Sequence, residues 1–160
     1  MKYCDKTDVK LLLPVDRPLK SDGTEYSESE WDAILDSIIE RQSGYIDDSV
    51  GNGYSFNSSG QKFNDIDDSP QTPAVIEEIA IDLVVAKALR YYGASYNAED
   101  NEVIKRYKSE SEAKLSQIRD GEILVSSSGE ILRTVSVSSM NDRPTGQDEP
   151  VFNPDDLDEF

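Results

Sequence analysis

Hydrophobic residues recur with helical spacing in four stretches of the chain, separated by polar segments that contain proline and glycine. The first stretch is short: Asp5 or Thr7 can cap it, and Pro14 ends it because the residue before a proline avoids helical dihedral angles. We predict a helix of about two turns here, with residues 11–13 among its apolar positions. A loop should follow over residues 15–26.

The second stretch begins with a capping box at Ser27 and Glu30. In this motif the serine hydroxyl accepts a hydrogen bond from the glutamate amide, while the glutamate carboxylate accepts one from the serine amide. Apolar residues then follow at helical spacing, with acids on the opposite face: Trp31, Ile34, Leu35, Ile38, Ile39, Tyr45 and Ile46. We predict a core helix and interpret Trp31 and Tyr45 as packing residues.

The third stretch, residues 74–92, has the clearest helical pattern of the chain. Thr72 can act as its N-cap with Pro73 at the first helical position, and Gly93 can end it. Because few polar residues interrupt the stretch, we expect this helix to be buried on most sides, in the centre of a bundle.

The last helix should begin within residues 97–100 and end at Gly121. Its apolar positions are Val103, Ile104, Tyr107, Leu115 and Ile118. Four basic residues also lie on it: Lys105, Arg106, Lys108 and Lys114. They can bind an acidic neighbour, but we favour a solvated face on which Glu102, Glu110 and Glu112 are their local partners.

Two segments depart from the helical pattern. Residues 51–71 are rich in Gly, Ser, Asn and Asp, and are longer than the usual helix connection of about two to eight residues. Such a loop is either disordered or functional, and its aromatic residues favour function.

In residues 131–137, apolar and polar residues alternate as in a strand, and such a strand would need a host sheet or another subunit. Residues 141–160 contain three prolines and mostly acidic charge, and cannot form a core.

These patterns predict an all-α fold, a small bundle of about four helices with a long inter-helix loop and an extended C-terminal arm that can add a strand. We expect a helical domain over residues 1–125, from which the loop 51–71 projects, and an acidic arm over residues 126–160. A length of 160 residues suits one such domain with appendages.

Charge and cysteine content limit the partners and the compartment. The 33 acidic and 16 basic residues give a net charge of −17, which argues against gripping nucleic acid through clustered Lys and Arg, although solubility alone also explains acidity. The single cysteine, Cys4, cannot form an intramolecular disulfide and fits a reducing compartment. We expect a soluble protein with no membrane segment, made in the cytoplasm, because the longest apolar stretch is broken by Asp82 and Lys87.

Candidate catalytic groups are scarce. The chain has no histidine, which removes the commonest general base and most zinc sites. Asp65, Asp67 and Asp68 resemble part of a calcium loop, but the glycine at its sixth position and its terminal glutamate are missing. We therefore predict no enzymatic activity, no metal and no cofactor. A magnesium-dependent enzyme that uses these aspartates is the weakest alternative.

In the order of its motifs, the chain resembles the head-completion adaptor or head-to-tail connector proteins of tailed bacteriophages, especially a Mu-like group. The resemblance spans most of the chain and rests on residues 3–9, Ile38, 45–47, 73–76, 79–83, Arg106, Tyr107, Leu115, Ile118, 121–123 and the aromatic-ended segment 151–160. That closing segment is more acidic here than in the group.

The resemblance implies a structural virion protein, located in the neck of the particle and made in the host bacterial cytoplasm. Its subunits would form a ring, a dodecamer in the family, beneath the portal, joining the capsid to the tail or neck proteins. The genome would pass through the channel without specific binding. As apolar anchors for neighbouring chains we expect residues of the loop and of the arm: Tyr54, Phe56, Phe63, Val151, Phe152, Leu157 and Phe160.

An acidic protein that mimics DNA and inhibits a basic partner is the main alternative. It would display carboxylates at phosphate-like spacing, bind a DNA-binding protein in a salt-sensitive way, and form no ring.

Overall fold

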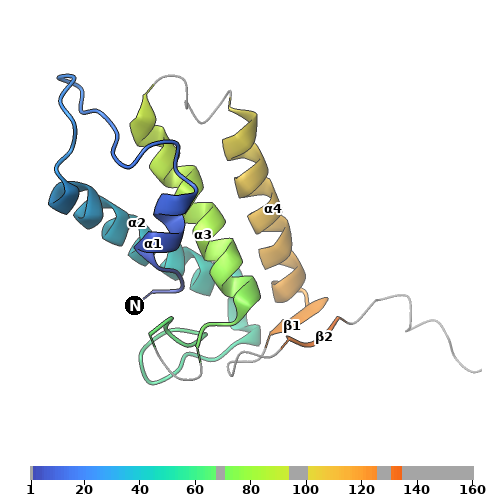
Figure 1. Cartoon of the computed structure of the whole chain (residues 1–160). Helices are drawn as coiled ribbons and strands as arrows, with labels where there is room; N and C mark the ends of the chain where they lie inside the picture. The colour runs from blue at the N-terminus through green and yellow to red at the C-terminus, as the bar shows by residue number, and fades with distance from the viewer. Residues whose placement is uncertain (1, 68–70, 94–100, 126–130, 135–160) are drawn as a thin grey trace, which may run out of the picture.

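The computed structural model describes residues 2–67, 71–93, 101–125 and 131–134. Within these residues, four α-helices pack together: α1 (Lys6–Leu11), α2 (Glu28–Ser49), α3 (Ala74–Ala88) and α4 (Glu102–Arg119). Two short 3-10 turns, η1 (Gly51–Gly53) and η2 (Leu89–Tyr92), extend α2 and α3. Helix α3 packs against each of the other three helices (Figure 1). This arrangement confirms the predicted all-α bundle.

Helix α3 forms the centre of the bundle because most of its residues are apolar and buried. The buried residues are Ile76, Ile79, Ala80, Leu83, Val84, Val85, Ala86 and Ala88. Its start differs from the prediction, since Pro73 is the N-cap and makes no side-chain capping bond. The Thr72 hydroxyl instead donates to the carbonyl oxygen of Asn64 at 2.8 Å, so it fixes the preceding loop. Gly93, with φ of +96°, ends η2 as expected.

Helix α2 starts at the predicted capping box. The Ser27 hydroxyl accepts from the Glu30 amide at 3.3 Å, and the Glu30 carboxylate accepts from the Ser27 amide at 2.8 Å. Trp31 is fully buried, which confirms it as a packing residue. Tyr45, by contrast, is 41% exposed and lies on the side of the bundle rather than in its core.

Helix α4 begins later than predicted, because Asn101 is its N-cap and accepts from the amide of Val103 at 2.9 Å. Residues 97–100, where the start was expected, lie outside the described residues. Two predicted ion pairs are present on its solvated face, Arg106–Glu110 and Lys108–Glu112, each at 3.6 Å. The ammonium group of Lys114 binds Glu78 of α3 at 2.8 Å instead.

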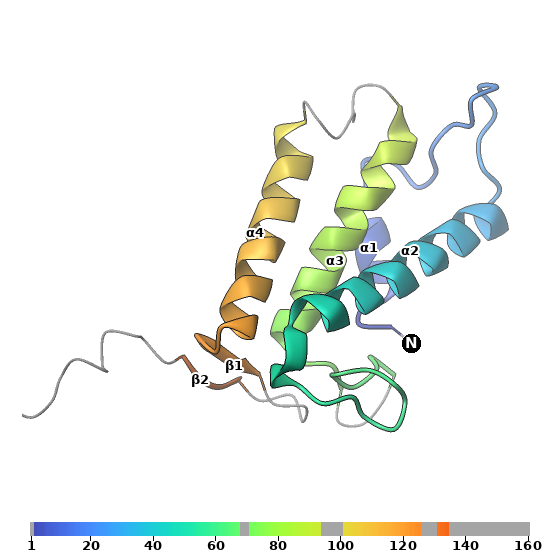
Figure 2. The same cartoon turned by 180° about the vertical axis from the view of Figure 1, so that it is seen from behind.

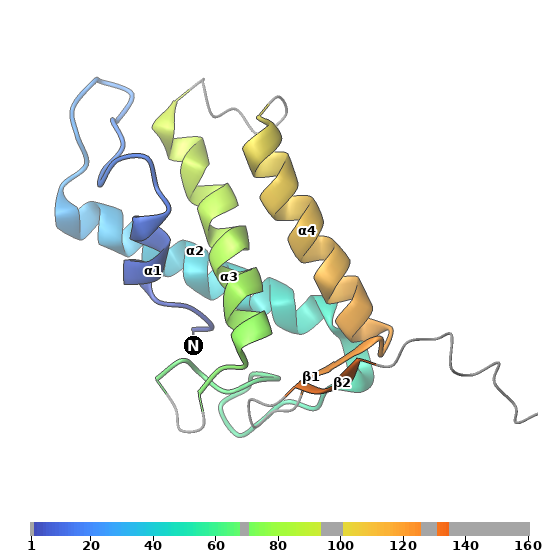
Figure 3. The ribbon, with the colours of Figure 1, turned by 45° about the vertical axis from the view of Figure 1, so that its right-hand side comes forward.

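The long loop and a short antiparallel ribbon close one end of the bundle (Figure 3). Strand β1 (Ile123–Val125) follows α4 directly and pairs with β2 (Ile131–Thr134), with Ile123 opposite Thr134. The strand predicted within residues 131–137 therefore finds its partner in its own chain, not in another subunit. Residues 135–160 lie outside the described residues.

Candidate interaction surfaces

Large exposed hydrophobic residues gather at the two ends of the bundle. One end, which we call the distal end, holds the loop after α1, the end of α3 and the start of α4 (Figure 1). The opposite end, the base, holds η1, the long loop and the β1–β2 ribbon. Exposed at the distal end are Leu11, Leu12, Val15, Leu19, Tyr91 and Val103, and at the base Phe56 and Leu124. Such groups mark protein contacts more often than isolated apolar residues do.

Four of these residues lie within positions 11–19 and form what we call the distal apolar surface: Leu11, Leu12, Val15 and Leu19. Leu11 is 78% and Leu19 59% exposed, whereas the adjacent Leu13 faces the core. Helix α1 has only six residues and ends at Leu11, so the three consecutive leucines at its end cannot all be covered by its one buried face. The sequence prediction had counted residues 11–13 among the apolar positions of this helix, whereas α1 ends at Leu11.

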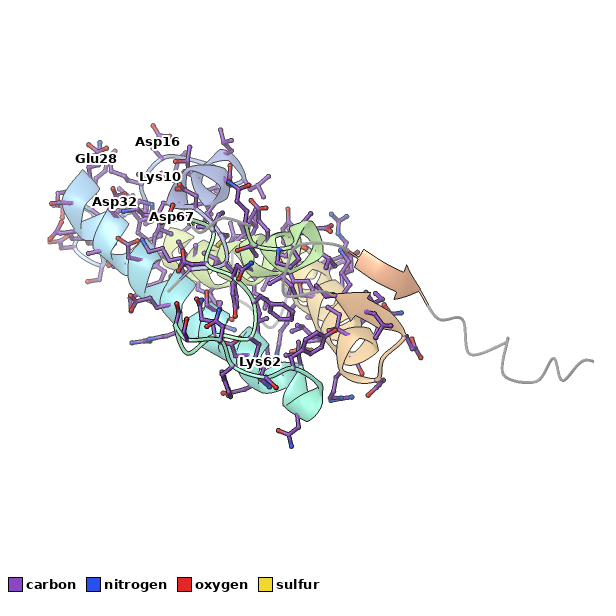
Figure 4. The ribbon with its side chains drawn as sticks, turned by 90° about the horizontal axis from the view of Figure 1, so that it is seen from below. Lys10, Asp16, Glu28, Asp32, Lys62 and Asp67 are labelled. Atoms are coloured by element: carbon purple, nitrogen blue, oxygen red, sulfur yellow. The ribbon has the colours of Figure 1, made fainter. Side chains whose placement is uncertain are left out.

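Ion pairs hold α1 in this orientation. The Lys10 ammonium lies 2.6 Å from the carboxylate of Asp32 on α2 (Figure 4). The Lys6 ammonium lies 3.0 Å from the carboxylate of Asp36. The hydrogen bond from Lys10 lowers the pKa of Asp32. These pairs are about one-third exposed, and such pairs contribute at most about 1 kcal/mol each. Their main effect is to keep the charged face of α1 on α2, which leaves Leu11 and Leu12 toward solvent.

A hollow of about 520 Å³ lies beside the distal apolar surface, between residues 14–21 and the end of η2. Val15 and Leu19 line it together with Pro14, Pro18, Tyr92 and Gly93. The Tyr92 hydroxyl donates to the Val15 carbonyl oxygen at 2.7 Å, so the loop is attached to the end of the central helix. The distal end is thus a shaped apolar surface on a fixed loop.

At the base, the structure separates the predicted aromatic anchors. Phe56 is 61% exposed, and the Lys62 ammonium lies 5.1 Å from the centre of its ring. Tyr54 is half-buried against Phe63, and its hydroxyl accepts from the Val125 amide at 3.1 Å. Phe63 is fully buried. Its prediction as a partner anchor is therefore wrong, because the chain's own core covers its side chain.

The remaining predicted anchors fall in the arm. Val151, Phe152, Leu157 and Phe160 lie outside the described residues. Of the three predicted anchors within the described residues, Phe56 is exposed, Tyr54 is half-buried and Phe63 is buried.

A buried polar cluster beneath the loop explains why Phe63 is in the core. The Tyr3 hydroxyl donates to Asp47 and accepts from the Phe63 amide at 3.2 Å, while the Lys62 amide donates to Asp47 at 3.0 Å. Burial raises the pKa of the Tyr3 hydroxyl and also that of the Asp47 carboxyl. The tyrosine therefore stays protonated and acts as a donor. This cluster ties the loop to the first residues of the chain.

The groups with reactive or metal-binding potential have structural roles in the described part of the chain. Asp65 accepts from the backbone amides of Lys2 and Asp67, and Asp68 lies outside the described residues. No cluster of three or more acidic or cysteine side chains suited to a metal ion occurs among the residues described. Cys4 is buried. None of the described helices has the length and apolar character needed to cross a membrane.

No family model, no curated protein and no solved structure matches this chain. Its function must therefore be inferred from its own surfaces and sequence. The distal apolar surface was missed from the sequence, although a run of three leucines at the end of a short helix is a usable signal for it, since one face cannot cover all three.

Proposed function

We propose that this chain is a structural subunit of the head-to-tail connector of a tailed bacteriophage. In this proposal it forms a ring beneath the portal, joins the capsid to the neck or tail, and lets the genome pass through the channel. The observation that carries the proposal is the distal apolar surface, Leu11, Leu12, Val15 and Leu19, which is exposed beside a shaped hollow. A subunit whose burial is completed by other chains would have such a surface.

The placement of exposed apolar residues at both ends supports a subunit that contacts partners in two directions. The loop after α1, which carries Val15 and Leu19, and the long loop, which carries Phe56, lie toward opposite ends of α3 and α4 (Figure 2). Between them, ion pairs such as Lys114–Glu78 cover the side of the bundle. We assign the two ends to contacts with copies of the same chain, with the portal, and with the next neck or tail protein.

The net charge fits a channel for DNA. Each subunit carries −17, and a ring multiplies this charge around the channel. A duplex inside would be repelled from all sides, so it would slide without adhering. The acidic arm, with Val151, Phe152, Leu157 and Phe160, is proposed to reach neighbouring chains in the assembled particle.

The test is the assembly state of the full chain. Mass measurement of the purified protein, alone and with a portal, together with electron micrographs, should reveal rings or collars with twelve-fold symmetry. The double variant Leu11→Ser and Val15→Ser should lose the ring while keeping its helical circular dichroism. Tyr45→Ser is the control, because Tyr45 is also exposed, at 41%, but lies on the side of the bundle rather than at either end.

Two results would oppose the proposal. One is a chain that stays monomeric with the portal present. The other is salt-sensitive binding to a basic DNA-binding protein without any ring, which would favour the DNA-mimic alternative.

A further inference from the structure

A pocket of about 240 Å³ opens between the second half of α2, the end of α3 and the start of α4. Figure 2 views these three helices from the side on which α2 crosses α3. Leu83, Ala86 and Ile104 give the pocket an apolar floor. Among its other lining residues are three cations and one acid: Lys87, Arg90, Lys108 and Glu112. Three cations around one pocket are unexpected in a chain with 33 acidic residues.

These cations are poorly neutralised. Across the described ranges, neither Lys87 nor Arg90 has an ion-pair partner, and Lys108 has only Glu112 at 3.6 Å. Partial burial lowers the pKa of Lys87, and the nearby Arg90 and Lys108 lower it further. Like charges held together in this way repel one another, and a bound anion would relieve the repulsion. The pocket is therefore complementary to a negatively charged group.

The size of the pocket limits that group. Small-molecule sites usually measure roughly 300–1,000 Å³, so this pocket suits a side chain better than a cofactor. An apolar floor under a cationic rim fits an apolar side chain with carboxylates on both sides. The chain contains that pattern once within its acidic arm, where Leu157 lies between Asp156 and Asp158, with Asp155 and Glu159 next to them.

The arm of the same chain is long enough to reach the pocket. Strand β2 ends at Thr134 beside β1, which follows the end of α4. From Arg119, at the end of α4, to Lys108 is about 16 Å along the helix. The roughly 20 residues between Thr134 and Asp155 can span up to about 65 Å. A tethered segment has an effective concentration in the millimolar range, which a separate chain at ordinary dilution does not match.

We propose that the pocket binds residues 155–160 of its own chain, with Leu157 on the apolar floor and the neighbouring carboxylates paired with Lys87, Arg90 and Lys108. This contact is independent of the connector proposal, because it forms in an isolated chain. In a connector it would keep Leu157 and Phe160 covered until a neighbouring protein competes for the arm.

Zero-length cross-linking of the full chain tests this proposal. A water-soluble carbodiimide joins a carboxylate to an amine that contacts it, so Lys87 and Lys108 should be linked to Asp155, Asp156, Asp158 or Glu159. The reaction is run on an equal mixture of unlabelled and nitrogen-15-labelled protein, and the linked peptides are identified by mass spectrometry. Contact within one chain gives pairs with a single isotope label only, and the yield should fall as salt is added.

The variant Arg90→Glu reverses one charge of the pocket but leaves the reactive amine of Lys87 in place. It should reduce the yield of these links several-fold. Arg41→Glu is the matched control, since Arg41 is also exposed and has no ion-pair partner among the residues described, but does not line the pocket. Absence of the links, an equal loss in both variants, or links with mixed labels would each overturn the proposal.

Discussion

The hydroxyl of Tyr3 donates a hydrogen bond to Oδ1 of Asp47 at 2.5 Å, although the two residues are 44 positions apart. The same carboxylate oxygen accepts from the Lys62 amide, and the tyrosine oxygen accepts from the Phe63 amide. Three segments that are distant in sequence thus meet at one pair of side chains. The position of the long loop depends on this pair more than on any local preference of the loop itself.

Removing the acceptor of this pair should destabilise the fold. In Asp47→Ala the buried Tyr3 hydroxyl and Lys62 amide lose their acceptor, so the free energy of unfolding should fall by about 1–3 kcal/mol. Asp47→Asn keeps an oxygen at this position without burying a charge, and should be close to wild type at neutral pH. Urea unfolding followed by circular dichroism measures both. Equal stability of the alanine variant would show that the cluster does not hold the loop.

The same aspartate should give the protein a pH dependence of known sign. Burial raises the folded-state pKa of Asp47 above its ordinary value of 3.8, so the folded protein binds this proton more tightly than the unfolded chain does. The contribution of Asp47 to stability should therefore increase as the pH falls through the folded pKa toward 3.8. In Asp47→Asn this contribution should be missing, so it should appear as the difference between the stability-versus-pH profiles of wild type and variant, measured by urea unfolding.

The capping box of α2 should show the opposite sign. Hydrogen bonds from the Ser27 amide and from Lys20 lower the pKa of Glu30 to about 2. Its contribution should be complete above about pH 4.5 and lost as the pH falls toward 2. Glu30→Gln should abolish this dependence. Ser27→Ala should reduce stability by about 0.5–2 kcal/mol at neutral pH, and a variant as stable as wild type would argue against the cap.

Two phenylalanines of the loop should respond very differently to truncation. Phe63→Ala removes a fully buried ring and should lower the free energy of unfolding by about 3–5 kcal/mol. Phe56→Ala removes an exposed ring, and the loss should stay below about 1 kcal/mol even with its Lys62 contact. Thermal unfolding of the pair compares them directly. Similar losses would contradict the assignment of Phe63 to the core and Phe56 to the surface.

Deletion of residues 141–160 should leave the helical circular dichroism intact while abolishing binding to the portal or the joining of tails. Phe152→Ala and Phe160→Ala should each weaken assembly by a few kcal/mol per interface at most. Particle yield and ring stability are the measurements. A normal yield from the deletion would show that the arm takes no part in assembly.

The helices were predictable because their signals are local. The capping box at Ser27 and the mostly apolar run of α3 each act within a few residues of the backbone they control. The end of α1 was predicted less well, since the helix ends at Leu11, before the residue that precedes Pro14. The burial of Phe63 was not predictable in this way. It depends on hydrogen bonds that the amides of Phe63 and Lys62 donate to Tyr3 and Asp47, and neither acceptor lies near Phe63 in sequence or carries a motif.

The surfaces were only partly predictable for a related reason. Phe56 lies in a polar segment and is exposed, as expected from the composition of that segment. The pocket with Lys87, Arg90 and Lys108 joins residues from three helices, so it emerges only once α3 and α4 lie side by side. Within the α4 sequence, Lys108 looks like any other charged residue of a solvent-exposed helix face, because its local partner is Glu112.

The buried position of Cys4 has a practical consequence for labelling this protein with a dye. Burial raises the pKa of its thiol to about 12, so the native chain presents almost no thiolate to maleimide reagents near neutral pH. A cysteine introduced in place of Phe56 or Val103 would then be the preferred target for a fluorescent dye. Single-site labelling is thus feasible while the natural sulfur stays in place.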